Sequence, residues 1–244
     1  IAWNLLTWYW GLPSSSSHAL VGGLVGVALA RRGLDGVLWP GVVGKVILPG
    51  LLSPLIGLVL GYLVMLTMYW ALRRARPTVN STFKRCQMVS ASLMAFAHGS
   101  NDAQKVMGII TMALFTAGLQ TDHEVPTWVK FACATAIALG TSGGGWRIIK
   151  TIGAKVVRLQ PVNGFSAELT SATVLISAAW LGMPISTTHV ITAAIMGVGA
   201  VKRVNAVRWG VASSILWAWT FTLPAAAGMA AACYYALRLL STAL

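Results

Sequence analysis

The sequence is poor in charged residues, and acidic residues are the rarest among them. Only 9 % of its 244 residues are charged, and five are Asp or Glu. A soluble domain usually has about a quarter of its residues charged, whereas here 57 % of the residues are apolar. At roughly 20 residues per membrane span, we expect an all-α polytopic membrane protein that crosses the bilayer about seven to nine times.

Cysteine is also scarce. The three cysteines, Cys86, Cys133 and Cys233, are far apart in the sequence and show neither metal-ligand spacing nor a disulfide pattern. We therefore expect packing roles for them, and neither a metal site nor a cofactor. No signal peptide is visible, and the chain begins at Ile1 within a Trp-rich apolar stretch, which we interpret as part of a longer protein.

Basic residues outnumber acidic ones and give a net charge of +13. They gather in short clusters between apolar runs, which is typical of cytoplasmic loops beside anionic lipid headgroups. We expect membrane lipid, and no nucleic acid, as a partner. The bias places the loops 73–85 and 147–164, the latter including Arg158, in the cytoplasm and the acidic loop 120–126 outside. Basic pairs also follow both copies of a repeated stretch, at 31–32 and 202–203, and inverted repeats would put them on opposite sides, so the sequence leaves the orientation open.

One stretch occurs twice, as residues 11–29 and 182–200. Each copy has a helix-breaking Gly-x-Pro, then hydroxyl residues and a histidine, then an apolar helix. Paired interruptions of this kind in the two halves of a membrane protein indicate a binding site near the bilayer midplane. The pattern predicts an inverted-repeat transporter with broken or re-entrant helices. The shared polar residues are Ser15, Ser16, Ser17 and His18 in the first copy, and Ser186, Thr187, Thr188 and His189 in the second.

The two hydroxyl runs lie at predicted helix N-termini, where backbone N–H groups and the helix dipole attract anions. We predict that these six hydroxyl residues, with Ser100 and Asn101, bind an oxyanion substrate. Ordinary N-capping explains one copy but not three consecutive hydroxyls and a histidine present twice. His18 and His189 either orient the hydroxyls, donate to the anion and couple protons, or serve as interhelical hydrogen-bond partners.

Two acidic residues, Asp102 and Glu168, fall within apolar segments. A carboxylate at membrane depth costs at least about 2.5–3.5 kcal/mol, so it normally faces a cavity or a partner. We predict that Asn101, Asp102 and Glu168 bind a coupling cation, and that the apolar run 86–119 breaks at residues 98–102. His98, Gln104 and Lys105 are further candidates; Lys105 either pairs with Asp102, screens the substrate or snorkels to an interface.

Prolines divide two other long apolar runs. The run 37–72 contains Pro40, Pro49 and Pro54, so it predicts either two helices in a hairpin or one re-entrant piece and one span. The run 207–240 is divided near Pro224 and predicts a closing hairpin.

These motifs resemble those of the inorganic phosphate transporter (PiT) family. The family's hallmark looks like Ala-His-Gly-Ser-Asn-Asp-Ala-Gln-Lys at 97–105, its Gly-x-Pro-x-Ser-Thr-Thr-His motif matches 182–189, and its membrane glutamate motif is similar to 164–168. The resemblance covers essentially the whole chain. Family members have the Asn-Asp motif in both halves, so we expect residues 1–72 to be the remainder of a first repeat, 73–85 a basic loop and 86–244 the second repeat.

The resemblance implies a multi-pass protein of the cell membrane that carries inorganic phosphate, alone or as a metal–phosphate complex. It further implies symport driven by a proton or sodium gradient, with no catalysis and no cofactor, and it is compatible with a homodimer. A sulfate or other oxyanion permease is the alternative on the same scaffold. An intramembrane serine hydrolase is a remote alternative, because neighbouring Ser or Thr and His residues on one helix point in different directions.

Overall fold

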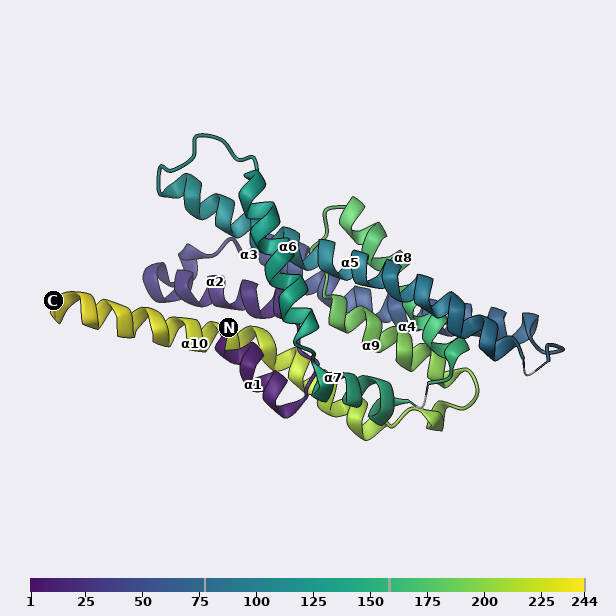
Figure 1. Cartoon of the computed structure of the whole chain (residues 1–244). Coiled ribbons are helices and arrows are strands. Elements are labelled where there is room, and N and C mark those ends of the chain that lie inside the picture. Colours follow the sequence, from purple (N-terminus) through teal and green to yellow (C-terminus); the bar gives the residue numbers. More distant parts are fainter. Residues whose placement is uncertain (77, 158, 244) are drawn as a thin grey trace.

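The computed structural model describes residues 1–244 except Pro77, Arg158 and Leu244, and the described residues form helices joined by short turns (Figure 1). Arg158 of the predicted basic connector therefore lies outside the described residues. The α-helices are α1 (Ala2–Trp10), α2 (Ser16–Arg32), α3 (Trp39–Val42), α4 (Leu48–Ala71), α5 (Val79–Thr116), α6 (Thr127–Ser142), α7 (Trp146–Lys150), α8 (Pro161–Trp180), α9 (Thr187–Ala200) and α10 (Trp209–Ala243). The shorter 3₁₀ and π turns are η1 (Gly33–Gly36), η2 (Val43–Ile47), η3 (Thr151–Val156) and η4 (Val204–Ala206).

The two copies of the repeated stretch fold alike. In each, a glycine with positive φ follows a helix: Gly11 (φ 69°) follows α1 and Gly182 (φ 64°) follows α8. A short extended segment then leads to a new helix, α2 or α9. The predicted helix break before each apolar helix is confirmed.

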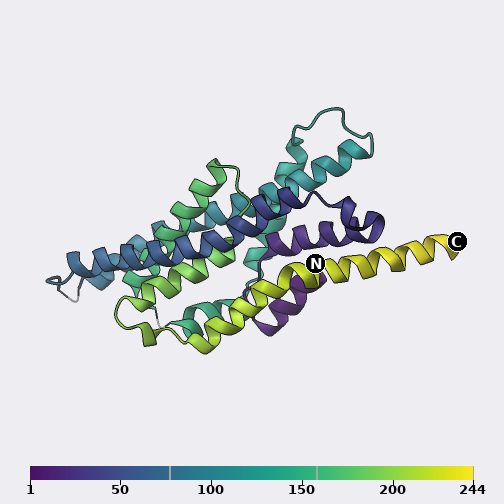
Figure 2. The ribbon, with the colours of Figure 1, turned by 180° about the vertical axis from the view of Figure 1, so that it is seen from behind.

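Each copy packs against the helix that follows the other copy. Helix α2 lies along α10, and α9 lies along α4. Both pairs are parallel and close: a Cβ at Gly22 or Gly26 would meet backbone atoms of Leu223 or Ala227, and α4 glycines approach α9 in the same way. Helices α2 and α9 run in opposite directions (Figures 1 and 2), so the two copies are interlocked.

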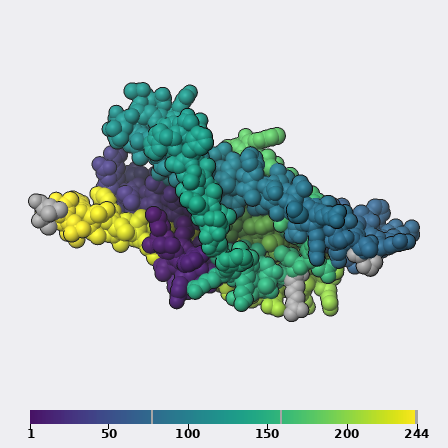
Figure 3. Space-filling model, viewed as in Figure 1, coloured from purple at the N-terminus to yellow at the C-terminus, as the bar shows by residue number. Residues whose placement is uncertain are grey.

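Helices α5 and α8 form the third pair and join these two. Helix α8 also contacts α4 and α9, and α6 packs on α5. The space-filling view shows the N-terminal residues and α6 on the same face of the molecule (Figure 3). This arrangement leaves a cavity between α1, α2, α5 and α6.

The prediction of a break at residues 98–102 is wrong, because α5 is helical throughout. A Cβ at Gly99 would have no neighbouring atom within 4 Å. No neighbouring element therefore approaches the backbone closely enough at this glycine to distort the helix. Helix α5 also begins at Val79, inside the predicted 73–85 loop, so that loop is shorter than expected.

The predicted proline breaks are also wrong. Residues Trp39–Ala71 form one helical run, and α10 continues through Pro224. Pro40 lies in the first turn of a helix, where its missing N–H costs no intrahelical bond. Pro54 and Pro224 lie inside helices that pack closely on α9 and α2; such packing is one way in which membrane helices tolerate proline.

Two of the described helical runs, Trp39–Ala71 and Trp209–Thr242, are long and apolar enough to cross a membrane. That is fewer than the predicted seven to nine. Helices α5 and α8 also reach the length of a span, with 38 and 20 residues, but they carry the polar side chains described below. The outer face of α4 exposes apolar side chains such as Leu51, Leu55 and Val59, which suits contact with lipid.

Candidate functional site

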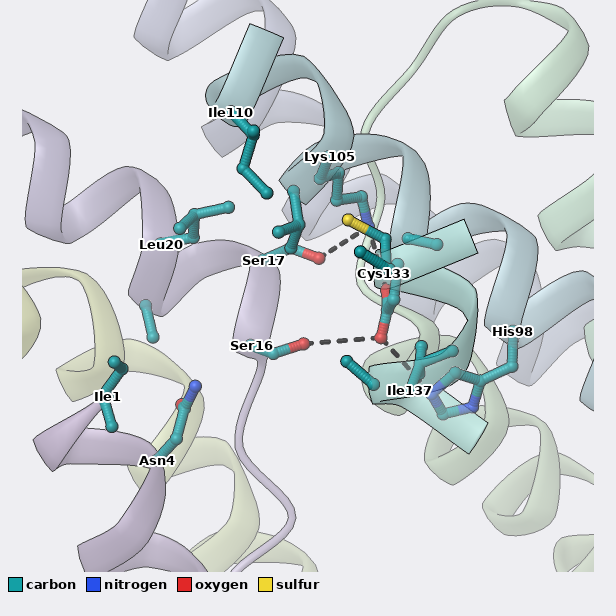
Figure 4. A pocket seen from close by; sticks show the side chains of 16 residues that line it. Ile1, Asn4, Ser16, Ser17, Leu20, His98, Lys105, Ile110, Cys133 and Ile137 are labelled. Carbon is teal, nitrogen blue, oxygen red and sulfur yellow. Dashed lines mark hydrogen bonds and ion pairs between the residues drawn. The ribbon is translucent and has the colours of Figure 1, made fainter. Parts of the chain in front are cut away.

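Both copies of the repeated stretch point a hydroxyl at one carboxylate. Ser16 and Thr187, which occupy equivalent positions in the two copies, lie 3.4 and 3.5 Å from Oδ2 of Asp102. His98 Nε2 lies 3.3 Å from the same oxygen. Figure 4 shows Ser16 reaching across to this carboxylate from α2. Asp102 on α5 is thus the point where the two copies meet.

Lys105 completes this meeting point. Its ammonium group donates to Ser17 Oγ of the first copy at 2.6 Å and to the Ile185 carbonyl of the second at 2.8 Å. It also pairs with Asp102 Oδ1 at 3.2 Å. Of the three alternatives for Lys105, the structure shows the ion pair with Asp102.

The helical geometry of α5 explains why these side chains converge. Residues three or four positions apart lie on the same helix face, so His98, Asp102 and Lys105 form one polar stripe. The side chains of Asp102 and Lys105 are only 15 % and 14 % exposed. An unwound backbone is not needed, because side chains supply the partners of the carboxylate.

A cavity of about 610 Å³ opens beside this stripe (Figure 4). Its polar end is formed by Ser16, Ser17, Asp102 and Lys105, and its other walls come mainly from apolar side chains of α5 and α6. A volume of this size is typical of small-ligand sites.

Two of the predicted substrate residues serve as helix caps. Ser15 Oγ accepts the backbone N–H of His18 at 3.1 Å, and Ser186 Oγ accepts that of His189 at 3.2 Å. A serine hydroxyl that accepts a bond can still donate its own hydrogen. The capping role and the predicted anion contact are therefore compatible. Thr188, the remaining hydroxyl, is half-buried.

The two histidines contact each other. The His18 and His189 rings lie edge to face with centroids 4.9 Å apart, and both side chains are buried. Trp219 of α10 stacks on His189 at 3.9 Å and donates from Nε1 to the Pro13 carbonyl at 2.9 Å. The ring contact places the histidines where the copies cross. His18 Nε2 and both ring nitrogens of His189 have no hydrogen-bond partner there, so the predicted interhelical hydrogen bonds are not seen and the other predicted roles stay predictions.

Glu168 lies apart from Asp102. It accepts hydrogen bonds from Ser90 Oγ at 2.5 Å and from Gln87 Nε2 at 3.4 Å, both on α5. Ser90 precedes Asp102 by about three helical turns, or roughly 18 Å along the axis. The structure therefore does not bring the predicted coupling residues into one cluster.

The remaining candidates occupy other faces of α5. Asn101 is buried, and its Oδ1 has no hydrogen-bond partner. Ser100 is half-buried and Gln104 is exposed. Among the residues that the structure describes, no group of three or more His, Cys, Asp or Glu could hold a metal ion.

Sequence reasoning missed Trp219 and the longer extent of the repeat. Trp39 and Trp209 donate from Nε1 to the carbonyls of Leu34 and Val204 in the same way, at 3.2 and 3.0 Å. The two pairs align with each other if the turn after α9 is one residue shorter than the turn after α2. A search that permits this gap would have found them, together with Pro54 and Pro224.

Comparison with known proteins gives consistent matches. The profile of the "Phosphate transporter family" matches residues 1–230. A "Probable low-affinity inorganic phosphate transporter" of Rhizobium meliloti is 52 % identical over 99 % of this chain and 72 % of its own length. The protein of the same description from Bacillus subtilis is 48 % identical over 98 % of this chain and 72 % of its own length. A solved structure described as "The sodium-dependent phosphate transporter" superposes with a TM-score of 0.82 at 25 % identity, covering 97 % of this chain and 76 % of that one.

Proposed function

Because the chain belongs to the phosphate transporter family, we propose that it carries inorganic phosphate across the cell membrane by symport with a cation. The observation that carries this proposal is the convergence of Ser16 and Thr187, from the two copies, on Asp102 beside a cavity. Family relatives are named as transporters, so the activity is transport and not catalysis.

The hydroxyls of both copies would hold the phosphate, and Asp102 would discriminate it from sulfate. Hydroxyls donate hydrogen bonds to an oxyanion without burying a charge. Phosphate near neutral pH keeps a proton that it can donate to a carboxylate, and sulfate does not. The carried species is phosphate alone or as a neutral metal–phosphate complex.

The repeated halves would act as an inverted-repeat transporter. In this proposal, residues 1–72 are the remainder of the first repeat and 86–244 the second repeat. The basic stretch 73–85 joins them, and its last residues already belong to α5. The opposite directions of α2 and α9 support this division, since inverted repeats that rock about a shared site give alternating access. The coupling gradient in this proposal is one of protons or sodium.

The test is uptake of labelled phosphate by the full-length protein in cells that lack their own phosphate transporters, with excess unlabelled sulfate as competitor. We expect uptake that resists sulfate. In Asp102→Asn, uptake should fall at least about tenfold, because a charge-assisted contact contributes about 1.5–3 kcal/mol.

The matched control is Asp122→Asn, an exposed residue of the loop between α5 and α6, which should transport normally. Unchanged phosphate uptake in Asp102→Asn would show that the carboxylate has no role in transport. Uptake abolished by sulfate would identify a sulfate permease.

A further inference from the structure

The bonding capacity of Lys105 is fully used inside the site. An ammonium group has three N–H donors and no acceptor. Its three acceptors are Ser17 Oγ, the Ile185 carbonyl and Asp102 Oδ1, at 2.6, 2.8 and 3.2 Å. With every donor engaged by the protein, Lys105 has none left for an anion.

The three oxygens come from three different parts of the fold. One is a hydroxyl at the start of α2, one a carboxylate of α5 and one a main-chain carbonyl just before α9. Carboxylate, hydroxyl and carbonyl oxygens are also the ligands that hard metal cations prefer. The oxygen cluster is therefore suited to a single positive charge, and Lys105 supplies that charge from within the chain.

We propose that the Lys105 ammonium is a built-in cation that takes the place of a free sodium ion in this oxygen cluster, so that transport does not require sodium. This inference rests on the proposed function and deepens it. The tether is short: Lys105 lies three residues after Asp102 on the same helix, so the positive charge stays with its carboxylate when the helix moves.

The charge balance of the site supports the substitution. The Asp102–Lys105 pair is neutral and largely buried, so in the site without bound phosphate a sodium ion would add an excess positive charge, which is costly in a buried site. Among the residues that the structure describes, the other four acidic residues supply no second carboxylate to this oxygen cluster. Glu168 binds Ser90 and Gln87 instead, and the rest are exposed in turns, namely Asp35, Asp122 and Glu124.

The experiment compares sodium with potassium in the full-length protein. Wild type, Lys105→Ala and the control Lys130→Ala are reconstituted into proteoliposomes, and labelled phosphate uptake is measured in Na⁺ or K⁺ at equal ionic strength. Lys130 is an exposed residue of α6 outside the site. Thermal unfolding of each purified protein is followed in NaCl and in KCl without phosphate, because a bound ion stabilises the folded state.

We expect wild type and Lys130→Ala to behave the same in both salts. Lys105→Ala should gain a saturable rise in unfolding temperature with Na⁺ over K⁺, and its uptake should become Na⁺-dependent. Lys105→Met, which keeps the length of the side chain without its charge, should leave less room for the ion and show a smaller Na⁺ effect.

Either of two results would overturn the inference. One is wild-type uptake, or wild-type thermal stability, that depends on Na⁺ over K⁺. The other is a Lys105→Ala protein that elutes as a folded species yet shows no preference for Na⁺. If wild type takes up no phosphate under any gradient, the proposed function fails, and the salt dependence of unfolding in Lys105→Ala still decides the cation site.

Discussion

Trp219 connects the two copies of the repeat through a single side chain. Its Nε1 donates to the Pro13 carbonyl before α2, while its ring stacks on His189 of α9. Trp219→Phe should keep the stacking and lose the hydrogen bond, leaving a buried carbonyl unpaired at a cost of about 1–3 kcal/mol. We expect a lower unfolding temperature and a higher KM for phosphate, measured on purified protein and by uptake.

Trp217→Phe provides the matched control for this substitution. Trp217 lies two residues earlier on α10 and is 61 % exposed, so its replacement should change neither quantity. Equal behaviour of the two variants would show that the Trp219 bond does not position the first copy.

At the scale of helices, close glycine contacts hold α2 on α10 and α9 on α4. A Cβ at Gly26 would lie 2.1 Å from the Ala227 carbonyl oxygen, and one at the equivalent Gly197 would lie 2.0 Å from that of Leu58. Backbone atoms cannot rotate away, so Gly26→Ala and Gly197→Ala should each destabilise the protein by about 1–3 kcal/mol or more. Size-exclusion elution after heating in detergent would measure this loss.

The same α2 helix contains its own control. A Cβ at Gly23 would have only Ala230 Cβ near it, at 4.0 Å. Because alanine favours helix over glycine by about 1 kcal/mol, Gly23→Ala should be neutral or slightly stabilising. If Gly23→Ala and Gly26→Ala were equally stable, the close packing of α2 on α10 would not be needed for stability.

Local patterns in the sequence predicted some of these elements and misjudged others. The Gly-x-Pro breaks before α2 and α9 could be predicted, because a glycine turn and a capping serine act within a few residues. The continuity of α5 through residues 98–102 and of α10 through Pro224 could not. Helix α10 packs against α2, which is distant in sequence, and Asp102 of α5 contacts Ser16 and Thr187 from two equally distant segments.

The site shows the same division. Asp102 and the two hydroxyl runs could be assigned together because a lone carboxylate and a duplicated motif both stand out in an apolar sequence. The separation of Glu168 from Asp102 could not be predicted from the sequence, because it depends on how α8 aligns with α5 in the folded protein. Sequence alone also left open whether Lys105 pairs with Asp102, because its two further acceptors belong to the two separate copies.

Across the whole molecule, charge is distributed unevenly between the two ends. The C-terminal ends of α4 and α9 meet at one end, where Lys202 lies over the Tyr69 ring at 6.0 Å and most of the basic clusters gather. The acidic loop 120–126 lies toward the opposite end of the molecule, the end at which α2 also finishes (Figure 1). By the positive-inside rule, we predict that the end with Lys202 faces the cytoplasm.

This asymmetry and the opposite directions of the two copies can be tested with one pair of equivalent positions. Asp35 follows α2 and Asn205 follows α9; both are exposed and occupy corresponding turns, η1 and η4. In a protein whose native cysteines are all replaced by alanine, Asp35→Cys should react with a membrane-impermeant maleimide in intact cells. Asn205→Cys should react only after permeabilisation, because inverted copies end on opposite sides of the membrane. Labelling of both cysteines from the same side would contradict the inverted arrangement. If Asn205→Cys reacted in intact cells and Asp35→Cys only after permeabilisation, the copies would be inverted but the orientation predicted from the basic clusters would be wrong.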